Sequence, residues 1–318
     1  MIAMEGTQAE VIAAGINAVD ILARPPEGHV PGGKSRADDL EIQGGGPAAT
    51  ACCVTAAFGR RTAFIARLGE DAISMLSRAQ FRAAGVSEQF LIDSPQQRPA
   101  VSVVQIDRIT GERTICYSLR DYGWLEEQDI PREAIAKAKL VFVDGYDPNA
   151  TLWILRAAQG TGCRSIVDLE HGDREFLLEC IALASEVILP LHTAKAATGK
   201  ESPEEALESL AMLGSGQMIV TDGARGSWAM TPDGIHHQPA FSVEVVDTNG
   251  CGDAYHGGYG VGLLEGWPVP LRMEFGAWVA SRVAMKLGGR GGIPGPVEAL
   301  AACPLFSPAL QEAVAKWD

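Results

Sequence analysis

The sequence predicts an α/β protein with three layers, in which helices cover both faces of a mostly parallel sheet. Two observations lead to this fold class. From residue 140 onward, short apolar runs alternate with longer helical segments, as in a parallel sheet that is crossed by helices. The chain also has no internal repeat and no linker long enough to separate two domains, so we expect a single domain over residues 1–318.

The N-terminal third is expected to begin with a buried strand over 11–16, which is a short apolar run. Residues 24–34 contain three prolines and three glycines, which exclude a regular helix. The triple glycine 44–46 precedes an alanine-rich helix over 48–58. A strand over 62–66 and a helix over 71–84 follow.

Residues 99–118 are expected to form a β-hairpin outside the main sheet. Side chains alternate in polarity over 99–107 and again over 113–118, and a glycine-containing turn separates the two runs. Both faces of this hairpin are partly apolar, so one of them needs a cover. A second copy of the same hairpin is the simplest cover, which predicts a two-fold homodimer. Val104 and Ile106 are the residues to test if they face the partner.

The C-terminal half continues the alternation of strands and helices. Ser202, Pro203 and Glu205 form a capping box that begins one of these helices. Buried strands are expected over 140–144, 165–168, 186–189 and 218–221. Helices are expected over 149–159, 173–184, 203–213, 251–265 and 270–287. A small antiparallel meander is expected over 227–230, 234–237 and 243–246.

Composition excludes several classes of partner. Forty acidic and 26 basic residues give a net charge of −14, which disfavours binding to nucleic acid. No apolar run approaches 18 residues, and the N-terminus has no basic cluster, so we expect neither a membrane span nor a secretory signal. The seven cysteines have no metal-like spacing, and we interpret them as reduced thiols of a cytoplasmic protein.

Two segments of the sequence fit phosphate-binding motifs, but the residues before them do not suit the strand that each motif needs. Residues 28–35 fit the P-loop pattern GxxxxGK[ST], but prolines precede the motif where a strand is needed. Gly44 to Ala49 fit the loose GxGxxA dinucleotide fingerprint, which would make the protein an NAD-type oxidoreductase. The preceding residues, Leu40 to Gln43, are short and polar for a central strand. Small residues that let a helix pack closely are an equally simple explanation of that motif.

A third motif, Asp247-Thr248-Asn249-Gly250-Cys251-Gly252-Asp253, stands at the start of a predicted helix. Its glycines free backbone N–H groups to face one point, and the positive end of the helix dipole adds to this anion hole. Asp253 is expected in the first turn, beside the anion hole. Its carboxylate could accept the proton of an attacking hydroxyl, or it could be an ordinary acidic N-terminal residue.

Residues 247–258, DTNGCGDAYHGG, resemble the DTxGAGDxFxGG signature of the PfkB (ribokinase-like) carbohydrate kinases. Three further landmarks follow the order found in that family. They are the glycine motif 44–51, the RLGED segment 67–71 and the TDGARG segment 221–226. Segments 111–113, 237–241 and 288–294 look most like the sulfofructose-kinase branch. The resemblance implies a Rossmann-like, ribokinase-like α/β/α fold with a small β-lid, formed by about 16–43 and 98–120.

The resemblance also implies an ATP-dependent kinase that phosphorylates a primary hydroxyl of a sugar or sugar derivative. Asp253 would be the catalytic base, and Gly250, Cys251 and Gly252 would form the anion hole. The sugar would contact Asn17, Asp20, Lys34, Gly45, Gly46 and Thr50. The nucleotide would contact Thr221, Gly223, Gly226 and Thr248. Many relatives pair through the lid, which agrees with a homodimer through 30–43 and 99–118.

The family's NxxE motif, which approaches Mg²⁺, should fall at 190–194, but neither its Asn nor its Glu is present. Asp247 and Glu170 are the replacements that we consider for Mg²⁺, and a monovalent cation such as K⁺ would also be compatible with the resemblance. Tyr146 and Cys116 stand where the sulfonate-binding branch would have an Arg and an Asn. A nucleoside kinase of the same fold and a non-catalytic sugar-binding regulator are the alternatives within the fold.

Overall fold

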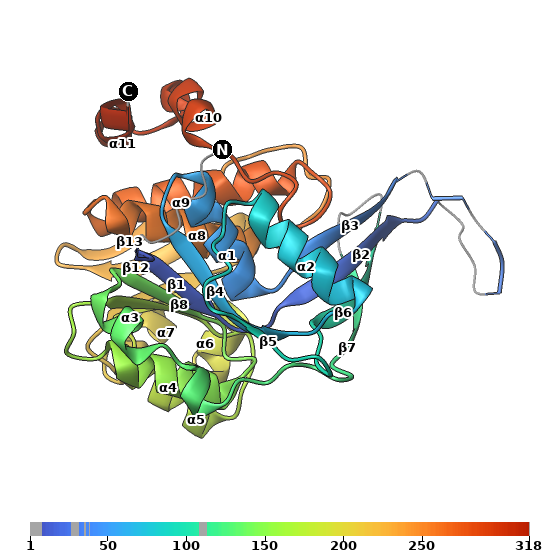
Figure 1. The fold of residues 1–318 in the computed structure, drawn as a ribbon. Helices are drawn as coiled ribbons and strands as arrows, with labels where there is room; N and C mark the ends of the chain where they lie inside the picture. Colours follow the sequence, from blue (N-terminus) through green and yellow to red (C-terminus); the bar gives the residue numbers. More distant parts are fainter. Residues whose placement is uncertain (1–7, 27–31, 35, 38, 108–112, 318) are drawn as a thin grey trace.

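The computed structural model describes residues 8–26, 32–34, 36–37, 39–107 and 113–317. Its centre is a nine-stranded sheet in the order β13-β12-β11-β10-β9-β8-β1-β4-β5 (Figure 1). All neighbouring strands from β11 to β5 run parallel, and β12 and β13 are antiparallel at one edge. The strands are β1 (Val11–Ala14), β4 (Thr62–Leu68), β5 (Leu91–Asp93), β8 (Leu140–Val143), β9 (Arg164–Asp168), β10 (Glu186–Pro190), β11 (Gln217–Thr221), β12 (Ser227–Thr231) and β13 (Gly234–Gln238).

Helices cover both faces of this sheet, which confirms the predicted fold class (Figure 1). One face carries α1 (Pro47–Ala57), α2 (Ala72–Ala83), α8 (Cys251–Leu264) and α9 (Val269–Ala284). The other carries α3 (Arg132–Lys137), α4 (Pro148–Ala158), α5 (Arg174–Leu183), α6 (Leu191–Thr198) and α7 (Pro203–Leu210). Successive β1 residues enter opposite cores, because strand side chains alternate between faces. Short elements complete the chain: α10 (Pro296–Ala301), α11 (Pro308–Val314), η1 (Glu127–Asp129), η2 (Gly223–Arg225), η3 (Cys303–Leu305) and η4 (Ala315–Trp317).

A second sheet has four strands in the order β3-β2-β6-β7 and projects from one end of the central sheet (Figure 1). Its strands are β2 (Ala18–Arg24), β3 (Asp39–Gly45), β6 (Ala100–Ile106) and β7 (Arg113–Ser118), and we call it the lid sheet. The inner face of the lid sheet packs against the body of the protein. Leu22, Val104 and Ile106 form a buried cluster there with Leu287.

The structure corrects one expectation from the sequence, the strand over 243–246. Residues 243–246 do not form a strand, because the N–H groups of Val246 and Asp247 bond to the carbonyl oxygen of Ala284 at the end of α9. Residues 40–43 belong to β3 of the lid sheet and not to the parallel sheet. The GxGxxA segment therefore lacks the parallel strand that a dinucleotide fold needs. The hairpin turn and most of the P-loop segment lie outside the described residues.

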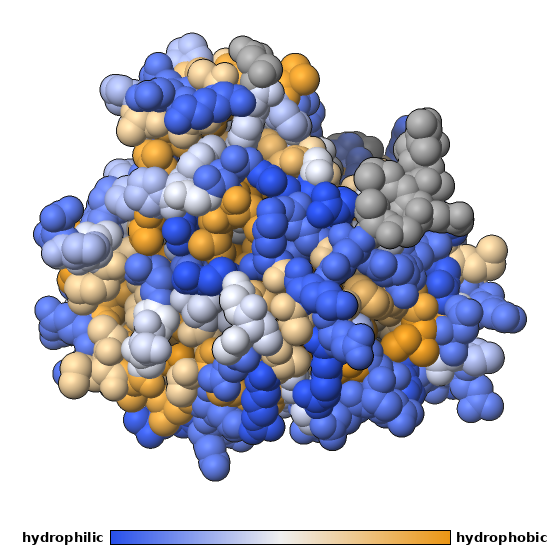
Figure 2. Space-filling model, turned by 60° about the vertical axis from the view of Figure 1, so that its left-hand side comes forward, coloured by the Kyte–Doolittle hydropathy of each residue, from blue (hydrophilic) through white to orange (hydrophobic). Residues whose placement is uncertain are grey.

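The described surface and helices agree with a chain rich in acidic residues. Figure 2 shows a face on which hydrophilic residues dominate and the hydrophobic areas are interrupted by them. None of the helices within the described ranges is long and apolar enough to cross a bilayer.

Candidate active site

A cleft of about 110 Å³ lies between the carboxyl edge of the central sheet and the lid sheet. Ligands commonly bind at this edge of open parallel sheets. The loops after β1, β8 and β9 contribute Ile16, Tyr146 and Glu170, and the start of α8 contributes Gly250 and Asp253. The other lining residues are Ala18, Asp20, Gly44, Gly45, Gly46, Pro47, Thr50, Ser102, Val104, Arg113, Ile115, Tyr117, Asn249 and Gly289.

The turn before α8 places backbone N–H groups at the edge of this cleft. Gly250 has a φ of 73°, a left-handed conformation that glycine adopts without strain. A Cβ on Gly250 would lie only 2.3 Å from the Cα of Gly289, so no side chain fits there. No side chain caps the start of α8, which leaves the positive end of the helix dipole open. This geometry is compatible with the anion hole expected at Gly250, Cys251 and Gly252.

Asp253 lies in the first turn of α8 and lines the same cleft. Burial raises the pKa of its carboxyl group to about 8, with further contributions from the neighbouring carboxylates of Asp168 and Glu170. His256 and Arg113 lower the pKa of Asp253. A carboxyl group that titrates near neutral pH beside an anion hole is suited to general acid–base chemistry.

Asp247, which precedes the turn, is fully buried and does not face the cleft. Its carboxylate accepts hydrogen bonds from the backbone N–H groups of Asn249 and Gly288, each at 2.8 Å. Asp247 therefore lies outside the lining of the cleft with each oxygen bonded to a backbone donor, and its contact with Mg²⁺ stays a prediction. Asp247 holds the turn against the segment after α9.

The opposite side of the cleft is built around Asp20 on β2. Ser102 on β6 donates its hydroxyl hydrogen to Oδ1 of Asp20, and burial raises the pKa of this carboxyl group. A Cβ on Gly45 would lie 2.1 Å from Oδ2 of Asp20, so glycine is required for the carboxylate to approach this backbone. Gly46 has a φ of 99°, and its Cβ would lie 1.9 Å from the carbonyl oxygen of Ile16. The glycine motif thus allows two close approaches at the floor of the cleft.

Arg290 reaches the junction of β3 and α1 from the segment after α9. Its guanidinium donates to the carbonyl oxygen of Gly45 at 2.9 Å and to Oγ1 of Thr50 at 3.3 Å. The buried Thr50 is therefore bonded to Arg290 at the floor of the cleft. The sequence analysis did not single out this arginine. The glycines on both sides of it were the available signal, because paired glycines often mark a close backbone approach.

Arg113 at the start of β7 is a second cleft residue that the sequence analysis assigned no role. Its Nη1 lies 3.3 Å from Oγ1 of Thr248 and donates a hydrogen bond to it. Thr248, which was expected to contact the nucleotide, therefore meets the lid sheet beside the anion hole. The contact also places a positive charge near Asp253.

Asn17 and Lys34 do not enter the cleft, contrary to expectation. The side-chain amide of Asn17 is buried and exchanges hydrogen bonds of 2.9 and 3.1 Å with Oγ of Ser77 on α2. It therefore anchors the connection between β1 and β2. Lys34 is exposed and is not a lining residue.

The expected nucleotide residues Thr221, Gly223 and Gly226 lie at the carboxyl end of β11, outside the lining of this cleft. Gly226 has a φ of 95°, and a Cβ there would lie 2.1 Å from the carbonyl oxygen of Gln238. The tight turn therefore has a structural reason, and the contact with a nucleotide stays a prediction.

The cleft does not fit a resident metal ion. Glu170 is its only lining candidate from the expected metal pair, since Asp247 faces away. Across the residues that the structure describes, no three Asp, Glu, His or Cys side chains are grouped so that they could hold a metal. Asp20 and Asp253 also line the cleft, but they are not grouped with Glu170 closely enough to surround one metal ion. Mg²⁺ would therefore have to be held chiefly by the phosphates of a nucleotide.

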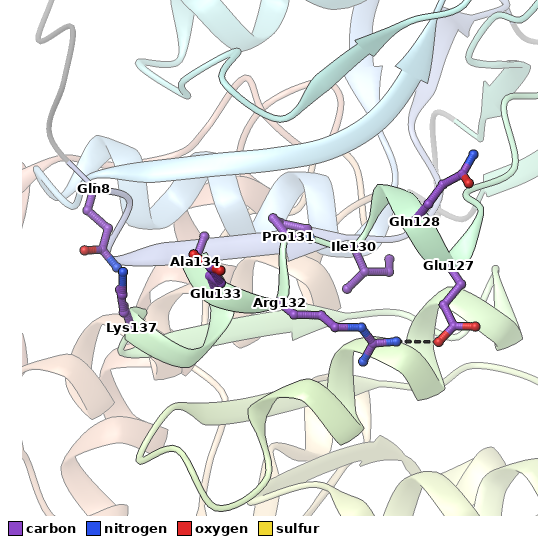
Figure 3. A pocket seen from close by; sticks show the side chains of 9 residues that line it. All are labelled: Gln8, Glu127, Gln128, Ile130, Pro131, Arg132, Glu133, Ala134 and Lys137. Atoms are coloured by element: carbon purple, nitrogen blue, oxygen red, sulfur yellow. Dashed lines mark hydrogen bonds and ion pairs between the residues drawn. The ribbon is translucent and has the colours of Figure 1, made fainter.

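A larger hollow of about 630 Å³ lies beside α3, far from these residues in the fold (Figure 3). Gln8 and Lys137 line one end of it, and Glu127 and Arg132 form a 2.6 Å ion pair at the other. Both partners of this ion pair are exposed, and none of the residues that line the hollow is a glycine. We therefore place the candidate active site in the cleft at Asp253.

Comparison with known proteins decides the family. The model of the pfkB family carbohydrate kinases matches residues 9–295. The chain belongs to the pfkB family of carbohydrate kinases. A pfkB kinase uses phosphoryl chemistry, so the oxidoreductase interpretation of Gly44 to Ala49 is wrong.

Relatives of this pfkB kinase cover most of its length. The fructokinase of Vibrio alginolyticus is 26% identical over 248 residues, which span 69% of this chain and 76% of the relative. A crystal structure from Agrobacterium tumefaciens covers 98% of this chain and 99% of its own, with a TM-score of 0.85 and 25% identity. The structure of Arabidopsis thaliana ribokinase with ribose and ATP has a TM-score of 0.78 and 21% identity, and the match covers 98% of each chain.

Proposed function

We propose that this kinase transfers the γ-phosphoryl group of ATP to a primary hydroxyl of a sugar or sugar derivative, with Asp253 as general base. One observation carries the proposal. Asp253 lies beside the uncapped glycine turn of α8 and shares a single cleft with the carboxylate of Asp20. One end of the cleft thus suits a phosphoryl group, and the other suits a polyhydroxylated acceptor.

In this mechanism the acceptor hydroxyl oxygen attacks the γ-phosphorus, and the bond from that phosphorus to the ADP oxygen breaks. Asp253 takes the hydroxyl proton as the new P–O bond forms. The N–H groups at Gly250 to Gly252 and the α8 dipole stabilise the negative charge on the transferred group. Arg113 adds a positive charge on the same side of the cleft.

The lid sheet supplies the acceptor side of the cleft. Asp20 would accept hydrogen bonds from sugar hydroxyls, and Ser102 fixes its orientation. Ile115 and Tyr117 on β7 line the cleft and remain exposed, so they can bury apolar surface when an acceptor binds. Closure of the lid sheet over the acceptor would exclude water during transfer.

A neutral sugar is the acceptor that the described cleft suits best. The resemblance to the sulfofructose-kinase branch also raises a sulfonated sugar, which needs a cation at the acceptor end. Arg113 is the only cation among the described lining residues, and it contacts Thr248 beside the anion hole. Arg290 is the described cation nearest the Asp20 end, and its guanidinium already donates to the carbonyl oxygen of Gly45 and to Oγ1 of Thr50.

We propose a homodimer that forms through the outer face of the lid sheet. The register places Ile42, Ile21, Val103 and Cys116 side by side in one row across all four strands. Ile42 is 48% and Val103 is 44% exposed, so none of the described residues covers the apolar surface of this face. Cytoplasmic ATP would supply the phosphoryl donor.

The experiment is ADP release by the purified full-length enzyme with ATP and a panel of acceptors. The panel contains fructose, ribose, a sulfonated hexose and adenosine, each with and without Mg²⁺ and K⁺. We expect turnover with a neutral sugar and its loss in Asp253→Asn. Turnover with adenosine alone would identify a nucleoside kinase. Tight sugar binding without ADP release from any acceptor would support a non-catalytic regulator and contradict the proposal.

A further inference from the structure

The imidazole of His256, which follows Asp253 by three residues on α8, is buried and has three polar contacts. Its Nδ1 lies 2.8 Å from the carbonyl oxygen of Gly252 and 3.3 Å from Oδ2 of Asp168. Its Nε2 lies 3.1 Å from the carbonyl oxygen of Ile188. The ring therefore connects the first turn of α8 to the carboxyl ends of β9 and β10.

These contacts determine the protonation of the ring. A carbonyl oxygen and a carboxylate oxygen are acceptors, so each contact requires an N–H donor on the imidazole. A neutral imidazole has one N–H group, and its other nitrogen would point a lone pair at an oxygen. Turning the ring over would bring carbon atoms to the same oxygens and lose the bonds. With the carboxyl group of Asp168 ionised, only the doubly protonated ring of His256 satisfies every contact.

Two physical effects oppose each other at this ring. Burial lowers the pKa of His256, because it penalises the imidazolium. The hydrogen bonds to Gly252 and Ile188 and the negative charges of Asp253 and Glu170 raise the pKa. Asp168 contacts Nδ1 directly, and burial and the charge of Glu170 raise the pKa of its own carboxyl group, which opposes the ion pair. We give the contacts more weight than burial, because both nitrogens face acceptors.

We propose that Asp168 and a doubly protonated His256 form a positioning pair that fastens the start of α8 to the sheet and gives Asp253 a permanent positive neighbour. The charged groups around Asp253 are otherwise Asp168 and Glu170, which oppose its ionisation, and Arg113 from β7. Without His256, the buried end of this cluster would hold carboxylates alone. The inference rests on the proposed role of Asp253 as the base.

The first test measures the protonation of His256 and does not depend on catalysis. A ¹⁵N spectrum of the histidine side chains is recorded on the full-length enzyme at about pH 9, where ordinary histidines are neutral. We expect one ring that still carries two protons, and its signals should vanish in His256→Gln. If every histidine ring is neutral at that pH, the proposal is overturned, whatever the role of Asp253.

The second test follows kcat/KM for the acceptor against pH, because its acidic limb reports the ionisation of the base. In His256→Gln we expect the limb to move up by about one pH unit, which is a tenfold loss at a pH on the limb. His256→Lys restores a positive charge and two or more donors, so its limb should lie nearer that of the wild type.

Tyr255→Phe is the matched control on the same helix. It removes the buried hydrogen bond of Tyr255 to Oγ of Ser227 without changing a charge near Asp253. The acidic limb of kcat/KM in Tyr255→Phe should stay at the wild-type pH, even if this variant is less stable. The proposal is overturned if His256→Gln leaves the pH of the acidic limb unchanged. It is also overturned if Tyr255→Phe shifts the limb by the same amount, because both results would show a purely structural role. If neither His256 variant folds, the wild-type ¹⁵N spectrum decides.

Discussion

In the proposed mechanism, Asp253 is buried beside the transferred group and must also lose its proton near neutral pH. Burial and two carboxylates raise its pKa to about 8, and His256 and Arg113 act against them. The raised pKa makes the carboxylate a stronger base than an exposed aspartate. The free enzyme then holds a proton on Asp253 over part of the physiological range, so activity should depend on pH.

The first prediction concerns this dependence. In the wild type, kcat/KM should rise with pH and level off above about 8, because only ionised Asp253 accepts the proton. Asp253→Asn should lower kcat by at least about 10²-fold, since asparagine accepts no proton. Binding of ADP, measured by calorimetry, should stay near normal. Wild-type turnover in the variant would remove Asp253 from the mechanism.

A second prediction follows from the same pKa. Between the ordinary value of 3.8 and about 8, the folded state holds a proton that the unfolded state has released. Stability of the wild type therefore falls as pH rises through this window. Asparagine removes this cost, so Asp253→Asn should unfold at a higher temperature than the wild type at pH near 8. The advantage should shrink toward pH 4. A difference that is constant with pH would contradict the raised pKa.

Sequence reasoning located the residues that belong to one contiguous motif. Gly250 and Asp253 were predicted from a single stretch of chain, because a glycine turn before a helix has a local geometry. Arg290 and His256 gained their roles only from the fold. Arg290 contacts Gly45 from 245 residues away, and His256 meets a carbonyl oxygen 68 residues away. Such contacts depend on the packing of whole elements, which one sequence does not reveal.

At the scale of elements, the start of α8 depends on the segment after α9. Gly250 packs on Gly289, and Asp247 bonds Gly288. The anion hole is thus held from two sides by glycine contacts that leave no room for a Cβ. Gly289 is the residue of the glycine-rich segment 288–292 that this contact requires, while a Cβ on Gly288 or Gly292 would meet Gln43 or Arg282 instead.

Gly250→Ala and Gly252→Ala form a matched pair that tests this packing. Alanine at Gly250 must adopt a φ of 73° and would meet Gly289, so it should cost about 1–3 kcal/mol of folding free energy. Alanine at Gly252 meets open space and needs no positive φ, so its cost should be near that of an ordinary surface change. Urea unfolding of both variants measures the difference. Equal stabilities would contradict the described packing.

The elements themselves were predicted to different degrees. The buried parallel strands were identified because continuous apolar runs leave few other arrangements. Residues 243–246 resemble a strand, but their backbone bonds to the end of α9. Helix α6 begins directly after β10 at Leu191, and its short, small-residue sequence has no clear apolar stripe. Contacts with the rest of the fold determine the backbone conformation of both segments.

At the scale of the whole molecule, we propose that the lid sheet has one face for the acceptor and one for a second copy of the chain. Val104 and Ile106 were the expected contacts with a second copy. The prediction that these two side chains face a partner is wrong, because both are buried with Leu22 and Leu287 inside the chain. The outer row of Ile42, Ile21, Val103 and Cys116 is the surface that remains.

Replacement of Ile42 and Val103 by Asp should therefore convert a dimer into a monomer of 33.6 kDa. The charges would be buried without partners at the interface, which association does not tolerate. Met212→Asp is the control, because Met212 is 86% exposed and lies in the turn after α7, outside the lid sheet. Analytical ultracentrifugation at micromolar concentration measures the state. A wild-type monomer, or a dimer in the double variant, would contradict the proposal.

The cleft has a further consequence for how the protein is made. Its walls come from Ile16 near the start of the chain, from Asp253, and from Gly289 near the end. Strand β1 also pairs with β8, which is synthesised more than one hundred residues later. A nascent chain can therefore bury much of its core while the catalytic centre is still incomplete. Phosphoryl transfer should therefore appear only in chains elongated past Arg290.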